Sequence, residues 1–335
     1  DVTERVKKAG RASPDSGSAE QARRAERSAI EKESKEKTGF HSEVVMLYRG
    51  GKYHLYRYKR YDDVRMVMAP EVAIAFFGGD ADNFEFPRYC LDVSFLRLWE
   101  NGKPAKMEQW LRWSPKGVGE GDLVMVSGHP GSTQRLNTVD HLRFLRDVAY
   151  PSYLELLYRR EIALQQFALK GPEARRIARG DLFGIENSRK AIRGTLGGLL
   201  SPATFESKLG QERALQAAVA ANDKLGASLD DWERIRHSMD ASKKFREEYI
   251  FLEGGRAFWS TLYSSAKMLL RLAQEQGKPS SERLPEYRDT RLPSVRMRLE
   301  SPAPVYPALE QAKLTDSLTH FMKVFGAEHP YVKLV

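Results

Sequence analysis

Between residues 42 and 126, polar and apolar side chains alternate in several short runs, a pattern typical of half-buried strands. Residues 43–48 and 53–59 are predicted to form two strands, joined by a hairpin turn at Arg49-Gly50-Gly51-Lys52. Further strands are predicted over 64–68, 92–99 and 123–126, with a turn at 102–104. Short strands that follow one another through tight turns predict an antiparallel barrel.

After residue 137 the apolar positions recur at the spacing of a helix. A helix with one apolar side is predicted from Pro151 to the break at Gly171-Pro172. Others are predicted from Pro202 to Gly226, from Ser228 through Ile235, over 258–277 and over 308–325. No repeat of fixed period is visible, so we expect an irregular bundle and not a solenoid.

The first 39 residues are rich in Ala, Lys, Glu and Arg, and 20–37 predicts an exposed helix that ends at Gly39. The whole pattern predicts an α+β fold in three parts. These are a peripheral charged helical segment over 1–39, part of a β-barrel over 40–147, and an incomplete α-helical domain over 148–335.

Composition limits the classes of protein to which the chain can belong. Its residues are 41% hydrophobic and no apolar run approaches the roughly 18 residues of a membrane span, so we expect a soluble protein without a membrane partner. The formal net charge is +9, but 54 basic residues are scattered among 45 acidic ones without a nucleic-acid-binding motif. This predicts a solvated basic surface that attracts acidic peptides, and no nucleic-acid partner.

Asp92 opens the predicted strand 92–99. A carboxylate at the start of an apolar strand is costly to bury unless it accepts hydrogen bonds, and the buried aspartate of a Ser-His-Asp triad requires this placement. Many strands also begin with a solvated aspartate, so the strand alone leaves both interpretations open. Cys90 is the single cysteine, which excludes an internal disulfide; we interpret it as a small buried side chain, with a nucleophilic thiol as the alternative.

The connection before Asp92 combines acids, an amide and aromatic residues in the string Gly78-Gly-Asp-Ala-Asp-Asn-Phe-Glu-Phe-Pro-Arg88. Together with Asp92 it closely resembles the bacterial dipeptidyl-peptidases seven and eleven, a family of chymotrypsin-fold serine exopeptidases with a large helical insertion. The matching positions are Gly78, Gly79, Asp80, Asp82, Asn83, Phe84, Phe86, Pro87, Arg88 and Asp92. The likeness continues through 61–65, 127–135, 184–190 and 301–304 and covers nearly the whole chain.

The resemblance implies a chymotrypsin-like (trypsin-like) double barrel, with 40–147 as part of its first barrel and a helical insertion after it. It implies that Asp92 orients the catalytic histidine, that Asn83 accepts hydrogen bonds from the substrate's ammonium group, and that Phe84 forms a wall of that pocket. Asp80 and Asp82 either add negative potential or, as we favour, cap the turn.

The implied activity is the release of dipeptides from the free N-terminus of oligopeptides by a serine-type dipeptidyl-peptidase. The resemblance implies no cofactor and no metal, a periplasmic or secreted location, and compatibility with a homodimer. The sequence begins with Asp1, and the strings that carry the family's triad histidine and serine do not occur in it. We therefore expect an internal fragment that is inactive by itself. The alternative is a non-catalytic peptide-binding or assembly module, and the flanking sequence would separate the two.

Other polar groups carry weaker signals. The segment Ser127-Gly-His-Pro-Gly-Ser-Thr133 lacks the P-loop spacing, and His129 and Ser132 do not form a nucleophile elbow, so we expect a structural role for it. Isolated histidines predict ordinary surface positions and no metal site: His237, His320 and His329. A basic helix face is predicted to be solvated, with substrate contact as the alternative: Arg189, Lys190 and Arg193.

Overall fold

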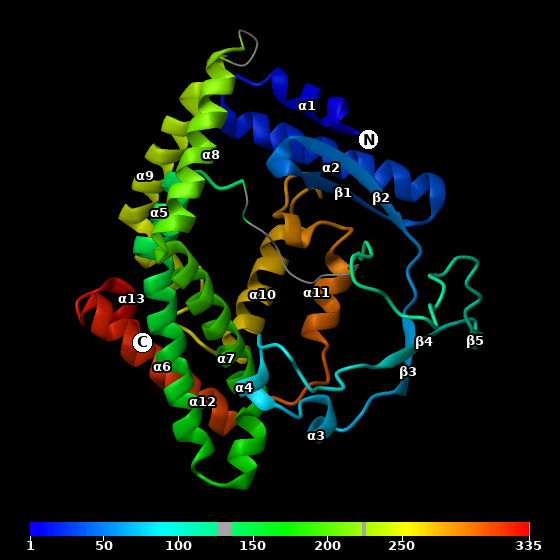
Figure 1. The fold of residues 1–335 in the computed structure, drawn as a ribbon, viewed down its shortest axis with the longest axis vertical. Coiled ribbons are helices and arrows are strands. Elements are labelled where there is room, and N and C mark those ends of the chain that lie inside the picture. The colour runs from blue at the N-terminus through cyan, green and yellow to red at the C-terminus, as the bar shows by residue number, and fades with distance from the viewer. Residues whose placement is uncertain (126–133, 135, 223–225, 335) are drawn as a thin grey trace. The chain divides into compact units, whose positions relative to one another are not determined.

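The computed structural model describes residues 1–125, 134, 136–222 and 226–334 (Figure 1). The chain divides into two compact units. The first consists of Asp1–Pro70, Val93–Ala105 and Ser260–Val305, and the second of Glu71–Asp92, Lys106–Trp259 and Tyr306–Val335. Among the described residues, no helix combines the length and the apolar character that a membrane crossing requires.

The first unit contains both sheets of the described chain and six helices or helical turns. Its elements are α1 (Thr3–Arg11), α2 (Ser16–Thr38), β1 (His41–Leu47), η1 (Tyr48–Gly50), β2 (Lys52–Tyr58), β3 (Asp63–Met68), β4 (Phe95–Glu100), β5 (Lys103–Pro104), α10 (Thr261–Gln276), η4 (Pro285–Tyr287) and α11 (Leu292–Leu299). Helix α2 begins at a capping Asp15, whose carboxylate accepts from two backbone N–H groups, and ends at Gly39 in the left-handed conformation (φ 71°). The predicted end of this helix is confirmed.

Strands β1 and β2 form the predicted antiparallel hairpin, with His41 opposite Tyr58 and Leu47 opposite Lys52. Figure 1 shows the hairpin lying along α2. Four buried apolar side chains from α1, α2, β1 and β2 form the core between them: Val6, Ile30, Val44 and Tyr53. The alternation of the hairpin therefore corresponds to one face covered by a helix.

Strands β3, β4 and β5 form a separate antiparallel sheet of three strands. Strand β4 begins at Phe95, three residues after Asp92, and residues 123–125 form no strand. The predicted chymotrypsin-like barrel is therefore wrong: the described strands make two small sheets and no closed barrel, and most other elements are helices. The alternating pattern located strands β1 to β4 but wrongly predicted one at 123–126, and it cannot tell whether strands pair all the way round, as a closed barrel requires.

The second unit is built from helices. They are α3 (Val72–Ala75), α4 (Gly79–Asp82), α5 (Val139–Phe144), the π-helical turn η2 (Leu145–Ala149), α6 (Tyr150–Ala168), α7 (Pro172–Leu200), α8 (Pro202–Ala220), η3 (Gly226–Leu229), α9 (Asp230–Leu252), α12 (Pro307–Phe325) and α13 (Pro330–Lys333). Helices α6 and α7 lie side by side (Figure 1), and their main core cluster joins both to α12. The members of this cluster are Leu164, Phe167, Ala178 and Leu309.

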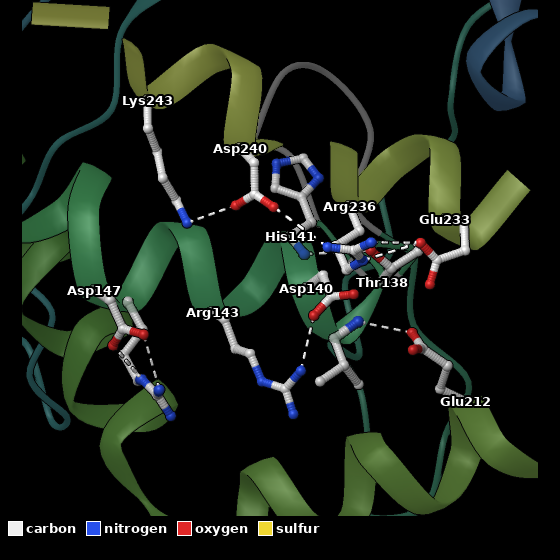
Figure 2. A network of polar contacts seen from close by, with 12 residues as sticks. Thr138, Asp140, His141, Arg143, Asp147, Glu212, Glu233, Arg236, Asp240 and Lys243 are labelled. Carbon is white, nitrogen blue, oxygen red and sulfur yellow. Dashed lines mark hydrogen bonds and ion pairs between the residues drawn. The ribbon is translucent and has the colours of Figure 1, made fainter. Parts of the chain in front are cut away.

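Polar contacts fix the short helix α5 against its neighbours (Figure 2). Glu212 of α8 accepts a hydrogen bond from the backbone N–H of Val139 at 2.7 Å, and Thr138 caps the same helix end by accepting from His141 N at 3.3 Å. Because α5 leads through η2 directly into α6, these contacts hold the start of the α6–α7 pair.

Candidate functional site

The motif loop, residues 76–92, folds back on itself. The Asp82 carboxylate accepts a hydrogen bond from the backbone N–H of Tyr89 at 3.2 Å, and the N–H of Leu91 donates to the carbonyl of Ile74 at 3.1 Å. A Cβ on Gly78 would lie 2.2 Å from the Asp82 side chain, so only glycine fits there. Asp82 thus closes the loop, in the manner of an aspartate in a turn.

Phe76 and Asp80 of this loop both contact helix α7. The rings of Phe76 and Phe183 meet edge to face with centroids 4.8 Å apart. The ammonium group of Lys190 lies 3.2 Å from Oδ2 of Asp80 and also donates to the Asp80 carbonyl. The other carboxylate oxygen of Asp80, Oδ1, is buried and has no hydrogen-bond partner within the described ranges.

Asn83 is the most enclosed polar residue of the loop, with 6% of its surface exposed. Its Nδ2 donates to Oδ1 of Asn187 on α7 at 3.1 Å, and its backbone N–H donates to the Asp80 carbonyl at 3.1 Å. With the amide nitrogen engaged, Asn83 Oδ1 has no partner among the residues that the structure describes. An amide held in this way presents a hydrogen-bond acceptor.

Phe84 follows Asn83 with a left-handed backbone (φ 68°). This conformation is uncommon for a bulky residue, and such strain persists only where the surrounding structure imposes it. The side chain is 60% exposed. The structure therefore places Phe84 beside Asn83 with its ring largely in solvent, and its role as a wall of a substrate pocket stays a prediction.

Helix α7 brings further charged groups to the same region. Arg189 and Glu161 of α6 form an ion pair of 2.5 Å in which both side chains are mostly buried, and the Arg189 guanidinium lies 5.6 Å from the centre of the Tyr158 ring. Burial raises the pKa of Glu186, as do the charges of Asp80 and Glu161. The predicted solvated basic face is wrong for Arg189 and Lys190, because both are paired with acids, whereas Arg193 is exposed.

Asp92 lies on the same loop as Asn83, with a side chain that is 64% exposed. It forms an ion pair of 3.2 Å with Arg88, and no histidine contacts it within the described part of the chain. Cys90 lies between Arg88 and Asp92 in the sequence and is half-buried. A hydrogen bond with the Arg88 side chain and one with the backbone N–H of Gly78 lower the pKa of its thiol. The predicted roles of Asp92 and of the Cys90 side chain stay predictions.

The remaining sequence candidates lie elsewhere. The segment with His129 and Ser132 falls outside the described residues. His237 is exposed as predicted, but His320 and His329 are half-buried, with ring centroids 5.3 Å from Phe251 and 4.9 Å from Phe325 respectively. No group of three His, Cys, Asp or Glu side chains in the described ranges is arranged to hold a metal ion.

Sequence reasoning gave no role to Asn187, which proved to be the partner of Asn83. The available signal was the spacing of Asn187 and Lys190, three residues apart within the matched segment 184–190. Residues at this spacing share one face of a helix. Both of these side chains face the motif loop.

Comparison with known proteins agrees with the resemblance seen in the sequence. A family profile described as Peptidase S46 matches residues 1–335. The chain is 31% identical over 271 residues to an Asp/Glu-specific dipeptidyl-peptidase of Shewanella putrefaciens, covering 77% of this chain and 36% of that relative. It is 29% identical over 217 residues to dipeptidyl-peptidase 7 of Phocaeicola vulgatus, covering 62% and 29%.

Among solved structures, the chain is similar to Porphyromonas endodontalis DPP11 in complex with the dipeptide Arg-Glu, with a TM-score of 0.70 and 23% identity. The match covers 98% of this chain and 49% of that one, and it shows a shared fold. The chain thus spans less than half the length of each relative named here. Because the family profile extends over its whole length, the chain belongs to the peptidase S46 family.

Proposed function

We propose that this chain is the part of a dipeptidyl-peptidase that holds the free N-terminus of an oligopeptide substrate. The observation that carries the proposal is Asn83, whose enclosed side chain is fixed by Asn187 and keeps Oδ1 as an acceptor. A peptide's N-terminal ammonium group has only hydrogen-bond donors, so it is a matching ligand. Relatives named as dipeptidyl-peptidases support the same activity.

An amide suits this task because it accepts a hydrogen bond from a cation without placing a second full charge in the pocket. Asn187 sets the orientation of the amide, since the Asn83 Nδ2 that donates to it leaves Oδ1 for the substrate. The acids nearby favour a cationic ligand: Asp80 has an unpartnered buried oxygen, and Glu186 is half-buried beside it.

In this proposal Asp92 orients a histidine and stabilises its imidazolium form during serine-type catalysis. The histidine and the serine would come from other parts of a full-length protein that contains this chain. To accept a hydrogen bond from the histidine, the exposed Asp92 carboxylate either gives up its ion pair with Arg88 or binds both groups at once. The chain by itself is expected to be inactive, since an orienting carboxylate alone can neither relay a proton nor form a covalent intermediate.

The test of the amine-binding role is Asn83→Ala in the full-length protein. Loss of one hydrogen bond to a charged group should raise KM for dipeptidyl substrates with a free amine by roughly 10- to 100-fold. The exposed neighbour Glu85 provides a control variant, Glu85→Ala, which should leave KM unchanged. N-acetylated substrates should be poor for all three proteins. An unchanged KM, with equal cleavage of blocked peptides, would refute the proposal.

The test of the catalytic role is Asp92→Asn. It should lower kcat by about 10⁴, because an amide would hold the histidine in the wrong tautomer. Asp80→Asn and Asp82→Asn should affect kcat far less. If Asp92→Asn keeps a normal kcat, the acid lies elsewhere. If the full-length protein binds peptides but no serine-directed fluorophosphonate labels it, the non-catalytic peptide-binding module is the correct interpretation.

The same proposal includes a periplasmic or secreted location and allows a homodimer. Cell fractionation of a producing strain tests the location, and light scattering on the purified protein tests the oligomeric state. A cytoplasmic protein would contradict the first of these.

A further inference from the structure

Helix α7 also contacts the motif loop through Lys190, one helical turn beyond Asn187. The ammonium group of Lys190 lies 3.2 Å from Asp80 Oδ2 and donates to the backbone carbonyl of Asp80. Both side chains are more than two-thirds buried. A lysine that contacts both the carboxylate and the carbonyl of one residue restrains its backbone as well as its side chain.

The Asp80 carbonyl is also the group that fixes the backbone of Asn83. It accepts the Asn83 N–H at 3.1 Å, so one oxygen receives hydrogen bonds from both Lys190 and Asn83. Lys190 holds this carbonyl oxygen in the place where it accepts the Asn83 N–H. Lys190 therefore acts on Asn83 through Asp80, while Asn187 acts on the Asn83 side chain directly.

The turn that carries Asn83 needs this external support. Helix α4 has only four residues, far below the length at which a helix is stable by itself. It starts at Gly79 with φ 60°, and Phe84, two residues after its end, has φ 68°. Glycine adopts this conformation freely, but a bulky residue such as Phe84 keeps it only where tertiary contacts hold it.

Helix α7 is itself held in place by buried contacts with α6 and with the motif loop. Its Arg189 forms the mostly buried 2.5 Å ion pair with Glu161 of α6, and Phe183 packs on Phe76 at the start of the loop. Helices α6 and α7 share a buried core cluster. A side chain on such a helix can position a binding group more accurately than the loop alone.

We propose that Lys190 is a positioning residue for N-terminal amine binding: through the Asp80 carbonyl and carboxylate it sets the turn that presents Asn83 Oδ1 to the substrate. The inference rests on the proposed function for its kinetic consequence. Its structural consequence, the restraint of the Asn83 turn by α7, does not depend on any activity.

The kinetic test compares three variants in the full-length protein. Lys190→Met should raise KM for free-amine substrates about tenfold with kcat unchanged, and Lys190→Arg should recover most of the loss, because a guanidinium also donates to a carbonyl and a carboxylate. Arg193→Met, an exposed cation one turn further along α7, is the matched control and should match the wild type. Equal KM values for Lys190→Met and the wild type would overturn the proposal.

A double variant separates positioning from direct contact. If Lys190 works through Asn83, Lys190→Met should add nothing to KM in an Asn83→Ala background. A further tenfold increase there would mean that Lys190 acts on substrate by itself, and would overturn the positioning role. If Asn83→Ala alone leaves KM unchanged, the proposed function fails. The structural test that follows still decides whether Lys190 restrains the Asn83 turn.

The structural test uses amide hydrogen exchange on the full-length protein. Lys190→Met should speed exchange in peptides that cover residues 80–90, because the Asp80 carbonyl that accepts the Asn83 N–H is no longer held by α7, while peptides from α2 and α12 stay unchanged. Arg193→Met should change neither. Unaltered exchange over residues 80–90 in Lys190→Met would overturn the restraint, and with it the proposal.

Discussion

The two small sheets of the first unit have similar sequence patterns and opposite environments. In the β1–β2 hairpin, alternate residues are buried against α1 and α2, and Tyr53 is only 3% exposed. In the β3–β4 pair every residue of β3 is exposed, and the cross-strand partners Met66 and Leu96 are 72% and 62% exposed. The hairpin has a helix across one face, and the described residues of the unit give β3 no comparable cover.

The difference shows what alternation can and cannot predict. A period of two indicates a strand with one face more apolar than the other. Whether that face is covered depends on another element, such as α2, whose position the strand itself does not encode. The barrel expectation failed at this step, because it assumed that neighbouring strands would cover one another.

The largest effect that would test this comparison is expected from Tyr53→Ala. Removing a buried aromatic side chain from the cluster of Val6, Ile30 and Val44 should lower the free energy of unfolding by about 3–5 kcal/mol. Tyr56→Ala, on the same strand but partly exposed, should cost less than about 1 kcal/mol. Denaturant unfolding of both variants gives the values, and equal losses would contradict the contrast between buried and exposed faces.

A smaller change in stability is expected in the second sheet. Met66→Thr should alter the free energy of unfolding by no more than about 0.5 kcal/mol, because the side chain is largely in solvent. The same change should reduce self-association, since an exposed apolar strand surface favours it. Light scattering of the 335-residue chain measures this. A loss of several kcal/mol would show that Met66 is covered after all.

The smallest effect concerns pH at the helix that covers the hairpin. Hydrogen bonds from Lys37 and Arg5 lower the pKa of Glu33 to about 2. A lowered carboxylate pKa stabilises the fold above the unfolded value and loses that contribution as pH falls toward the folded one. The wild type should therefore lose more stability than Glu33→Gln between about pH 5 and 2. The difference should shrink in high salt, because these groups are in solvent; parallel pH profiles would exclude the linkage.

The helical part was predicted in outline, with one large omission. Helices α6, α10 and α12 were expected close to their observed ranges because their apolar residues repeat regularly. A basic helix face was predicted within α7, but its range was not, and its many glycines explain why, since glycine lowers helix propensity: Gly180, Gly184, Gly194, Gly197 and Gly198. Packing against α6 supplies the stability that its own sequence lacks.

Only the candidate site residues that belong to the sequence motif were predicted. The string 78–92 located Asn83, Phe84 and Asp92 on one loop, because its turn residues and its resemblance to a family are local features. Asn187 and Lys190 lie more than 100 positions away, and their contacts with the loop depend on how α7 packs beneath it. No local pattern contains that information.

Binding of a dipeptide with a free N-terminus tests the central claim most directly. Calorimetry on the full-length protein should give an affinity that falls roughly 10- to 100-fold in Asn83→Ala, with Asn187→Ala also weaker and the double variant no weaker than Asn83→Ala. N-acetylation of the dipeptide should abolish the difference between wild type and variants. Equal affinities of wild type and Asn83→Ala for the free dipeptide would contradict the claim that Asn83 receives the substrate's N-terminus.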